Sequence, residues 1–111
     1  MSLEEVVFTI ISHAGDAKSL CFEALAMAKK GEFEKADALI KDAQNELYET
    51  HNIQNSMIQK EASGEKLELS LLLMHAEDHL MTAILAKDLI EEMIEIYREN
   101  KKYKEAVEND D

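Results

Sequence analysis

Polar side chains that could do chemistry are concentrated in the segment 75–79 (HAEDH), directly after a run of leucines. Residues three, four and seven positions apart share one face of a helix, so His75, Asp78, His79 and Thr82 line up together. The same row continues into apolar residues in both directions (Leu72, Ala86, Leu89 and Met93). We therefore expect two imidazoles and a carboxylate on a buried or half-buried face. Desolvation there disfavours imidazolium and leaves a neutral nitrogen as nucleophile or ligand.

Three interpretations of this segment compete. In the first, the histidines only make hydrogen bonds in a polar layer of the core. In the second, His75 and His79 hold a metal ion from adjacent turns, in an order reminiscent of an inverted zinc-protease motif with Asp78 in place of its glutamate. The chain is small for a protease, and no distal ligand stands out in the sequence. In the third, one histidine accepts a phosphoryl group, which requires only a nucleophilic nitrogen at an accessible point of a rigid scaffold.

Length and charge limit what the chain can be. It has 111 residues, with 24 acidic and 12 basic side chains and a formal net charge of -12. We expect one domain over residues 1–111. The acidic excess argues against nucleic acid and against anionic membrane surfaces as partners. No apolar run is long enough to cross a bilayer and the start has no basic signal-peptide region, so we expect no membrane insertion. One cysteine, Cys21, permits no internal disulfide, which suits the cytoplasm.

The elements that position segment 75–79 are expected to be helices. The chain has no proline and only three glycines, and apolar residues recur at spacings of three and four. We predict an all-α fold with helices over residues 3–30, 32–62 and 66–104, followed by a frayed acidic tail at 105–111. Because short connections make sequential helices antiparallel, the sequence predicts an up-down-up three-helix bundle.

The third helix is too apolar for a chain that acts alone. Five apolar residues here point in nearly every direction around a helix, interrupted only by Ser70: Leu69, Leu71, Leu72, Leu73 and Met74. Two neighbouring helices cannot cover all of them. We expect the remaining apolar face to contact another subunit.

Gly15 lies inside the first helical stripe, where glycine costs about 1 kcal/mol relative to alanine. It marks either a slight irregularity or a point where another backbone or a site group approaches closely.

Three separated segments resemble one known family. Residues 71–82 (LLLMHAEDHLMT) are similar to the signature of the enzyme IIA component of the lactose/cellobiose (including chitobiose) class of the bacterial sugar phosphotransferase system. Residues 14–19 (AGDAKS) match the family's first helix, where Arg often stands in place of Lys18. Residues 51–54 (HNIQ), followed by Glu61-Ala62 and Gly64, resemble its second helix and turn. The resemblance covers nearly the whole chain.

The resemblance implies a phosphotransferase. His75 would accept a phosphoryl group from the phosphocarrier HPr and pass it to a cysteine of enzyme IIB during uptake of a lactose/cellobiose-type sugar. His79 would lie beside the phosphoryl site. The resemblance further implies a homotrimer in which Asp78 of every subunit binds a divalent metal ion, which we expect to be Mg²⁺, on the symmetry axis. A cation there would offset the repulsion among three buried carboxylates.

Some residues depart from the family pattern or carry a simpler interpretation. Glu77 stands where the family usually has Gln, and its charge would oppose an incoming phosphoryl group unless it points to solvent or is protonated. His51 matches a family position but is interpreted as structural, and His13 as incidental. Cys21 lies on the apolar stripe and is interpreted as a core residue.

Two other functions fit a small helical bundle. A two-component histidine phosphotransfer domain is one, but its phosphorylated histidine is usually followed by a Lys-Gly pair, whereas Glu77, Asp78 and His79 follow His75 here. A non-catalytic helical adaptor is the other, and it would leave the paired histidines unexplained.

Overall fold

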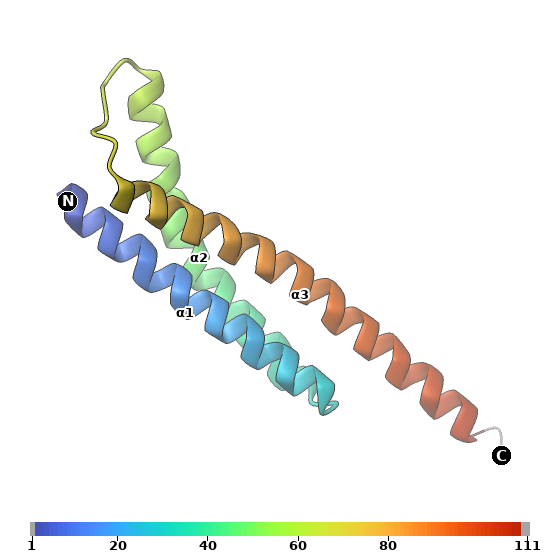
Figure 1. The fold of residues 1–111 in the computed structure, drawn as a ribbon. Coiled ribbons are helices and arrows are strands. Elements are labelled where there is room, and N and C mark those ends of the chain that lie inside the picture. The colour runs from blue at the N-terminus through green and yellow to red at the C-terminus, as the bar shows by residue number, and fades with distance from the viewer. Residues whose placement is uncertain (1, 110–111) are drawn as a thin grey trace.

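Three long helices packed together make up the computed structural model, which describes residues 2–109. The helices are α1 (Leu3–Lys29), α2 (Phe33–Ala62) and α3 (Leu71–Asn109), and no residue between 2 and 109 forms a strand. In Figure 1, α1 and α3 run in the same direction and α2 runs back between them in sequence, so neighbouring elements along the chain are antiparallel. The predicted all-α fold is confirmed. No helix within these residues is long and apolar enough to cross a membrane.

Local signals mark both ends of α1. The Ser2 hydroxyl accepts a hydrogen bond from the Glu5 N–H at 3.2 Å and caps the start of α1. After Lys29 the chain turns at Gly31, which adopts the left-handed region with φ 82° and donates its N–H to the Ala28 carbonyl at 3.0 Å. A side chain would be strained at that φ, so glycine suits the end of the helix. Helices α1 and α2 both lie within one residue of their predicted bounds.

The third helix differs from the predicted range 66–104 at both ends. It begins at Leu71, because the Ser70 hydroxyl accepts the Leu73 N–H at 3.0 Å and caps the helix there. Residues 65–70 form a non-helical connection instead. At the other end, nothing in the sequence stops the helix after residue 104, and residues 105–109 of the predicted frayed tail are helical. The rest of that tail, residues 110–111, lies outside the described residues.

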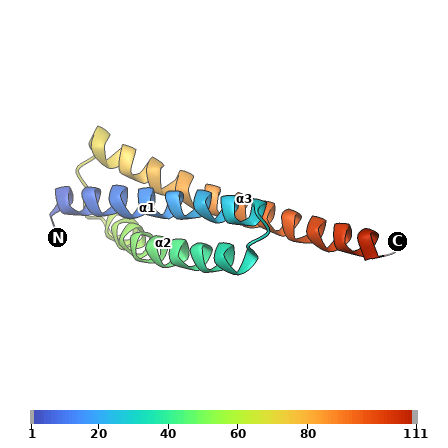
Figure 2. The same cartoon turned by 90° about the horizontal axis from the view of Figure 1, so that it is seen from below.

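Small side chains on α1 hold the three helices together. Ala14, Ala17, Cys21 and Ala24 have no exposed surface, and they let the backbones of the neighbouring helices approach closely. Figures 1 and 2 show α1 lying along both other helices, whereas α2 and α3 diverge from each other toward the connection between them. Helix α1 is therefore the element against which α3 is positioned.

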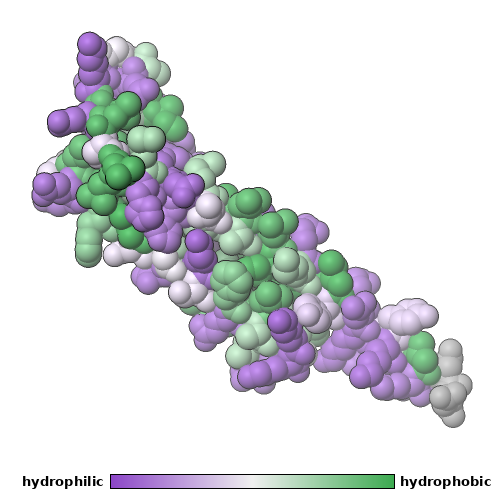
Figure 3. Space-filling view, in the orientation of Figure 1, coloured by the Kyte–Doolittle hydropathy of each residue, from purple (hydrophilic) through white to green (hydrophobic). Residues whose placement is uncertain are grey.

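Only one side of α3 is covered. Leu73, Ala76, Leu80 and Ala83 are buried against the bundle. The opposite side, called here the apolar face of α3, is open, and Figure 3 shows apolar residues exposed over this part of the molecule. This face consists of Leu71, Leu72, Met74, Met81, Leu85, Leu89, Met93 and Ile96, all exposed in the chain. The prediction that α3 keeps an uncovered apolar face is confirmed; its covering by another subunit stays a prediction.

We expect Ala17→Leu to destabilise the bundle by about 1–3 kcal/mol, because the extra volume forces α1 away from its neighbours. Chemical denaturation followed by circular dichroism measures the free energy of unfolding. Ala38→Leu, at an exposed position of α2, is the matched control and should change it by no more than about 0.5 kcal/mol. Equal effects of the two substitutions would contradict the packing role given to α1.

Candidate functional site

His75, Asp78 and His79 lie together near the start of α3, and the helix itself brings them together. The ring centroids of His75 and His79 are 5.5 Å apart, with the planes at 61° in an edge-on arrangement. His75 and Asp78 are exposed and His79 is half-buried. The row was expected on a buried or half-buried face, and for His75 and Asp78 this is wrong in the single chain. The reason is that α1 and α2 cover the opposite side of α3.

An exposed imidazole on a rigid helix is suited to a transfer reaction. A second protein can reach the His75 ring, because no other element of residues 2–109 buries it. The backbone on either side of His75 is fixed, since Leu73 and Ala76 are buried in the core. A nucleophile held in place at the surface supplies the positioning on which phosphoryl transfer mainly depends.

A short hydrogen-bond chain connects this part of α3 to α1. The Lys18 ammonium donates to the Thr82 hydroxyl at 3.4 Å, and that hydroxyl donates to the His79 carbonyl at 3.0 Å. Lys18 therefore places a positive charge on the side of α3 that carries the histidines.

Asp78 is surrounded along the helix by apolar residues. Met74, Met81 and Leu85 are four residues before, three after and seven after it, and are 59%, 54% and 58% exposed. The Asp78 carboxylate remains hydrated as long as this face of α3 is exposed to water. Within residues 2–109, no group of three or more His, Cys, Asp or Glu side chains could hold a metal ion.

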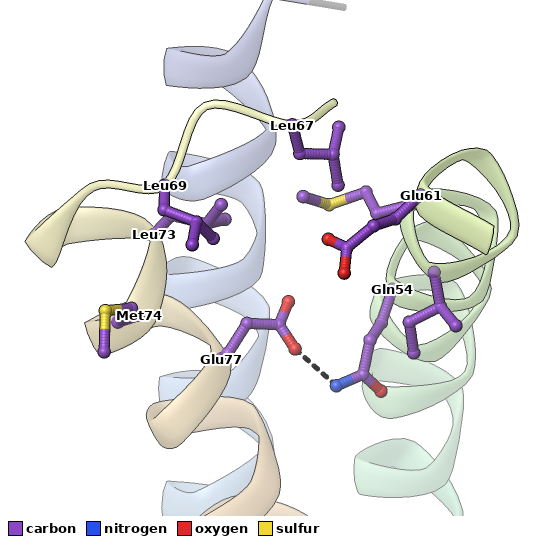
Figure 4. A pocket seen from close by; sticks show the side chains of 9 residues that line it. Gln54, Glu61, Leu67, Leu69, Leu73, Met74 and Glu77 are labelled. Atoms are coloured by element: carbon purple, nitrogen blue, oxygen red, sulfur yellow. Dashed lines mark hydrogen bonds between the residues drawn. The ribbon is translucent and has the colours of Figure 1, made fainter. Parts of the chain in front are cut away.

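Glu77 points away from the histidines. Its side chain turns toward α2, where Gln54 donates a hydrogen bond to its Oε2 atom (Figure 4). The carboxylate of Glu77 lies on another side of α3 from His75. Its charge therefore does not face an incoming phosphoryl group, and neither solvent exposure nor protonation of Glu77 has to be invoked. This Gln54–Glu77 contact was not predicted from the sequence. The signal for it was Gln54 itself, a polar residue within the apolar stripe of α2.

The other singled-out residues lie outside the site. His51 is exposed on α2. His13, interpreted as incidental, forms an ion pair with Glu46 and so ties α1 to α2. Cys21 is fully buried in the core, as interpreted from the sequence.

The comparisons with known proteins all indicate the same family. The model of the family "PTS system, Lactose/Cellobiose specific IIA subunit" matches residues 5–98. The lactose-specific EIIA component of Lactococcus lactis is 46% identical over 105 residues, covering 92% of this chain and 100% of the relative. The crystal structure of the cellobiose-specific enzyme IIA from Bacillus anthracis superposes with a TM-score of 0.86 at 42% identity, covering 92% of this chain and 94% of that one.

A third relative was solved together with a protein partner. It is IIA(Chitobiose) of Escherichia coli in solution structures of its complex with HPr. It has a TM-score of 0.76 and 40% identity, over 91% of this chain and 98% of that chain.

The buried thiol of Cys21 should react slowly. Burial raises its pKa above the ordinary value, with the nearby Lys87 opposing the shift and Glu91 adding to it, so less thiolate is present at pH 8. We expect alkylation by iodoacetamide at least about tenfold slower in the native protein than in urea, because the folded state lowers both access and thiolate fraction. Intact mass over time measures it. Equal rates would contradict the core position of Cys21.

Proposed function

The chain belongs to the family of lactose/cellobiose-specific IIA subunits of the sugar phosphotransferase system and is a phosphocarrier of that system, and we propose that His75 is the residue that carries its phosphoryl group. The observation that supports this choice is exposure. The imidazole of His75 is exposed to solvent, whereas that of His79 is half-buried and that of His13 is paired with Glu46. His51 is also exposed, but it lies alone on α2.

We propose HPr as the phosphoryl donor and the cysteine of enzyme IIB as the acceptor. A relative of 40% identity has been solved bound to HPr, which supports the donor. The acceptor is inferred from the family. The sugar would belong to the lactose/cellobiose type, and the relay would operate in the cytoplasm, where an unpaired thiol such as Cys21 is stable.

The transfer needs little from the protein besides position. The lone pair of one His75 ring nitrogen attacks phosphorus in line as the bond between phosphorus and the donor breaks, and the donor keeps that bond's electron pair. In the second step the IIB thiolate attacks phosphorus, and the electron pair of the P–N bond returns to His75. The His79 ring lies next to the acceptor ring in an edge-on arrangement, with the two ring centroids 5.5 Å apart. We assign it to orienting that ring next to the phosphoryl site.

We propose that three chains assemble through the apolar face of α3. The exposed residues of this face are too extensive for a surface that stays in water. Helix α1 adds Phe8 and Phe22, which are 73% and 57% exposed, and Gly15 lies midway between them in sequence. A Cβ at Gly15 would meet nothing within 4 Å in its own chain. This favours the second interpretation of Gly15, with the approaching backbone belonging to a neighbouring subunit.

Assembly through this face would bring three Asp78 carboxylates together out of water. Carboxylate oxygens are suitable ligands for Mg²⁺, and one ligand from each chain, completed by water, fits its preference for oxygen. We propose that Asp78 of each subunit holds such an ion. The ion would neutralise the charge repulsion at the centre of the assembly and so stabilise it.

We expect His75→Ala to abolish phosphorylation while leaving the fold intact. The variant lacks the only nucleophile of the reaction. Incubation with phosphoenolpyruvate, enzyme I and HPr, followed by intact mass and an acid-lability test, measures the label. His79→Ala should keep the label but slow its appearance about tenfold or more, a size typical of lost orientation, and His51→Ala is the control without effect.

Other outcomes of that experiment point to other functions. Label transferred only from a response regulator would indicate a histidine phosphotransfer domain. No label from either donor would indicate the helical adaptor. Label that persists in His75→Ala would place the acceptor elsewhere.

The metal proposal predicts that a chelator weakens assembly only when Asp78 carries charge. EDTA should raise the trimer dissociation constant of the wild type at least about tenfold, since it leaves three carboxylates unneutralised. Asp78→Asn should form a trimer that EDTA does not affect, because amides do not repel one another. Sedimentation velocity at two protein concentrations measures both. Asp42→Asn, exposed on α2, should behave as the wild type, and a wild type that stays monomeric with Mg²⁺ present would contradict the assembly.

A further inference from the structure

A pocket with a volume of about 380 Å³ lies between the end of α2, the connection 63–70 and the start of α3. Figure 4 shows Leu69 of the connection beside Leu73 of α3 on one side of it, and Leu67 at its upper end, above Glu61 of α2. The volume is in the range of small-molecule sites, which are mostly apolar and carry a few convergent polar groups. The pocket is separate from the exposed His75 ring, which does not line it.

One polar atom in the wall of this pocket has no partner. Gln54 satisfies one oxygen of the Glu77 carboxylate. The other oxygen, Oε1, is buried and accepts no hydrogen bond from any of residues 2–109. Buried acceptors in native proteins are nearly always paired, and an unpaired charged one is especially costly. A contact between Gln54 and Glu77 that served only to join two helices would not explain why the second oxygen is buried without a donor. A donor group on a bound molecule would explain it.

The charge of the lining indicates what kind of donor fits. Glu61 also points its carboxylate into the pocket (Figure 4), and none of the residues that line it is Lys, Arg or His. Apart from Gln54, the remaining walls are aliphatic or thioether side chains. A cationic group is therefore favoured at Glu77 and Glu61, while an alkyl body is favoured against the walls.

We propose that this pocket binds a small molecule that carries a primary ammonium group on a short alkyl chain. On binding, the Glu77 side chain turns its closed Oε1 atom toward the ammonium, which donates to it. Glu61 adds attraction, and the alkyl chain packs between Met57 and Met74. This site does not depend on the phosphocarrier function, since it uses none of the residues assigned to phosphoryl transfer.

Methyl NMR of the full chain, labelled at its methionine methyl groups, tests the proposal. Met57 and Met74 line the pocket, whereas Met27 and Met93 do not. On titration with n-butylammonium, the Met57 and Met74 resonances should shift saturably while those of Met27 and Met93 stay. Butan-1-ol has the same alkyl body without the charge and should bind at least about tenfold more weakly, as expected for the loss of a charged hydrogen bond.

Variants separate the role of the carboxylate from that of the apolar walls. Glu77→Gln keeps the shape of the side chain and should weaken butylammonium binding at least about tenfold. Glu61→Gln should weaken it less, and Glu34→Gln, exposed near the start of α2, should leave it unchanged. Unchanged Met27 and Met93 spectra report that each variant is folded. Phosphorylation of His75 should be retained in all three variants, so failure here is distinct from failure of the relay.

Three results would overturn the proposal. One is the absence of a saturable shift at Met57 and Met74 with butylammonium. Another is equal binding of butylammonium and butan-1-ol, or of wild type and Glu77→Gln. The third is a shift of these methyl groups on addition of HPr alone, which would make the pocket a protein contact rather than a small-molecule site.

Discussion

Two helices can cover only one side of a third, and the function of this chain depends on that constraint. The small side chains of α1, among them Ala17 and Cys21, bring the helices close and bury one side of α3. What α3 exposes on its other side is then fixed by helical periodicity. His75, Asp78 and the apolar face share that open side, so the surface proposed for phosphoryl transfer and the surface proposed for assembly are products of the same packing.

The sequence predicts the helices well where the local signal at a helix end is clear and poorly where neighbouring residues obscure that signal. Ser2 and Gly31 mark the bounds of α1, and both act locally. The start of α3 was placed too early, because the capping of α3 by Ser70 was not recognised within a leucine-rich segment. Periodicity also identified which residues share the face of His75, but not whether that face is covered. Deciding between two apolar sides of one helix requires the positions of its neighbours.

Contacts between helices are the least predictable part of the structure. The pairs His13–Glu46 and Gln54–Glu77 each join residues far apart in sequence, and their partners depend on the register of two packed helices. The two-residue separation of His75 and Glu77 illustrates the same limit. Such a step turns a side chain through about 200° around a helix. The negative charge of Glu77 therefore lies in a pocket that faces α2 and not beside the phosphoryl site.

The position of His75 relative to Asp78 makes assembly and transfer compatible. Three residues along a helix correspond to a rotation of about 60° around it. Asp78 lies in line with Met74, Met81 and Leu85, at the centre of the open side. His75 is rotated from that line toward the side of His79 and Thr82, where Lys18 of α1 makes contact. Burial of the central stripe among subunits would then enclose Asp78 but leave the His75 ring at the edge, where a second protein can still reach its nitrogen.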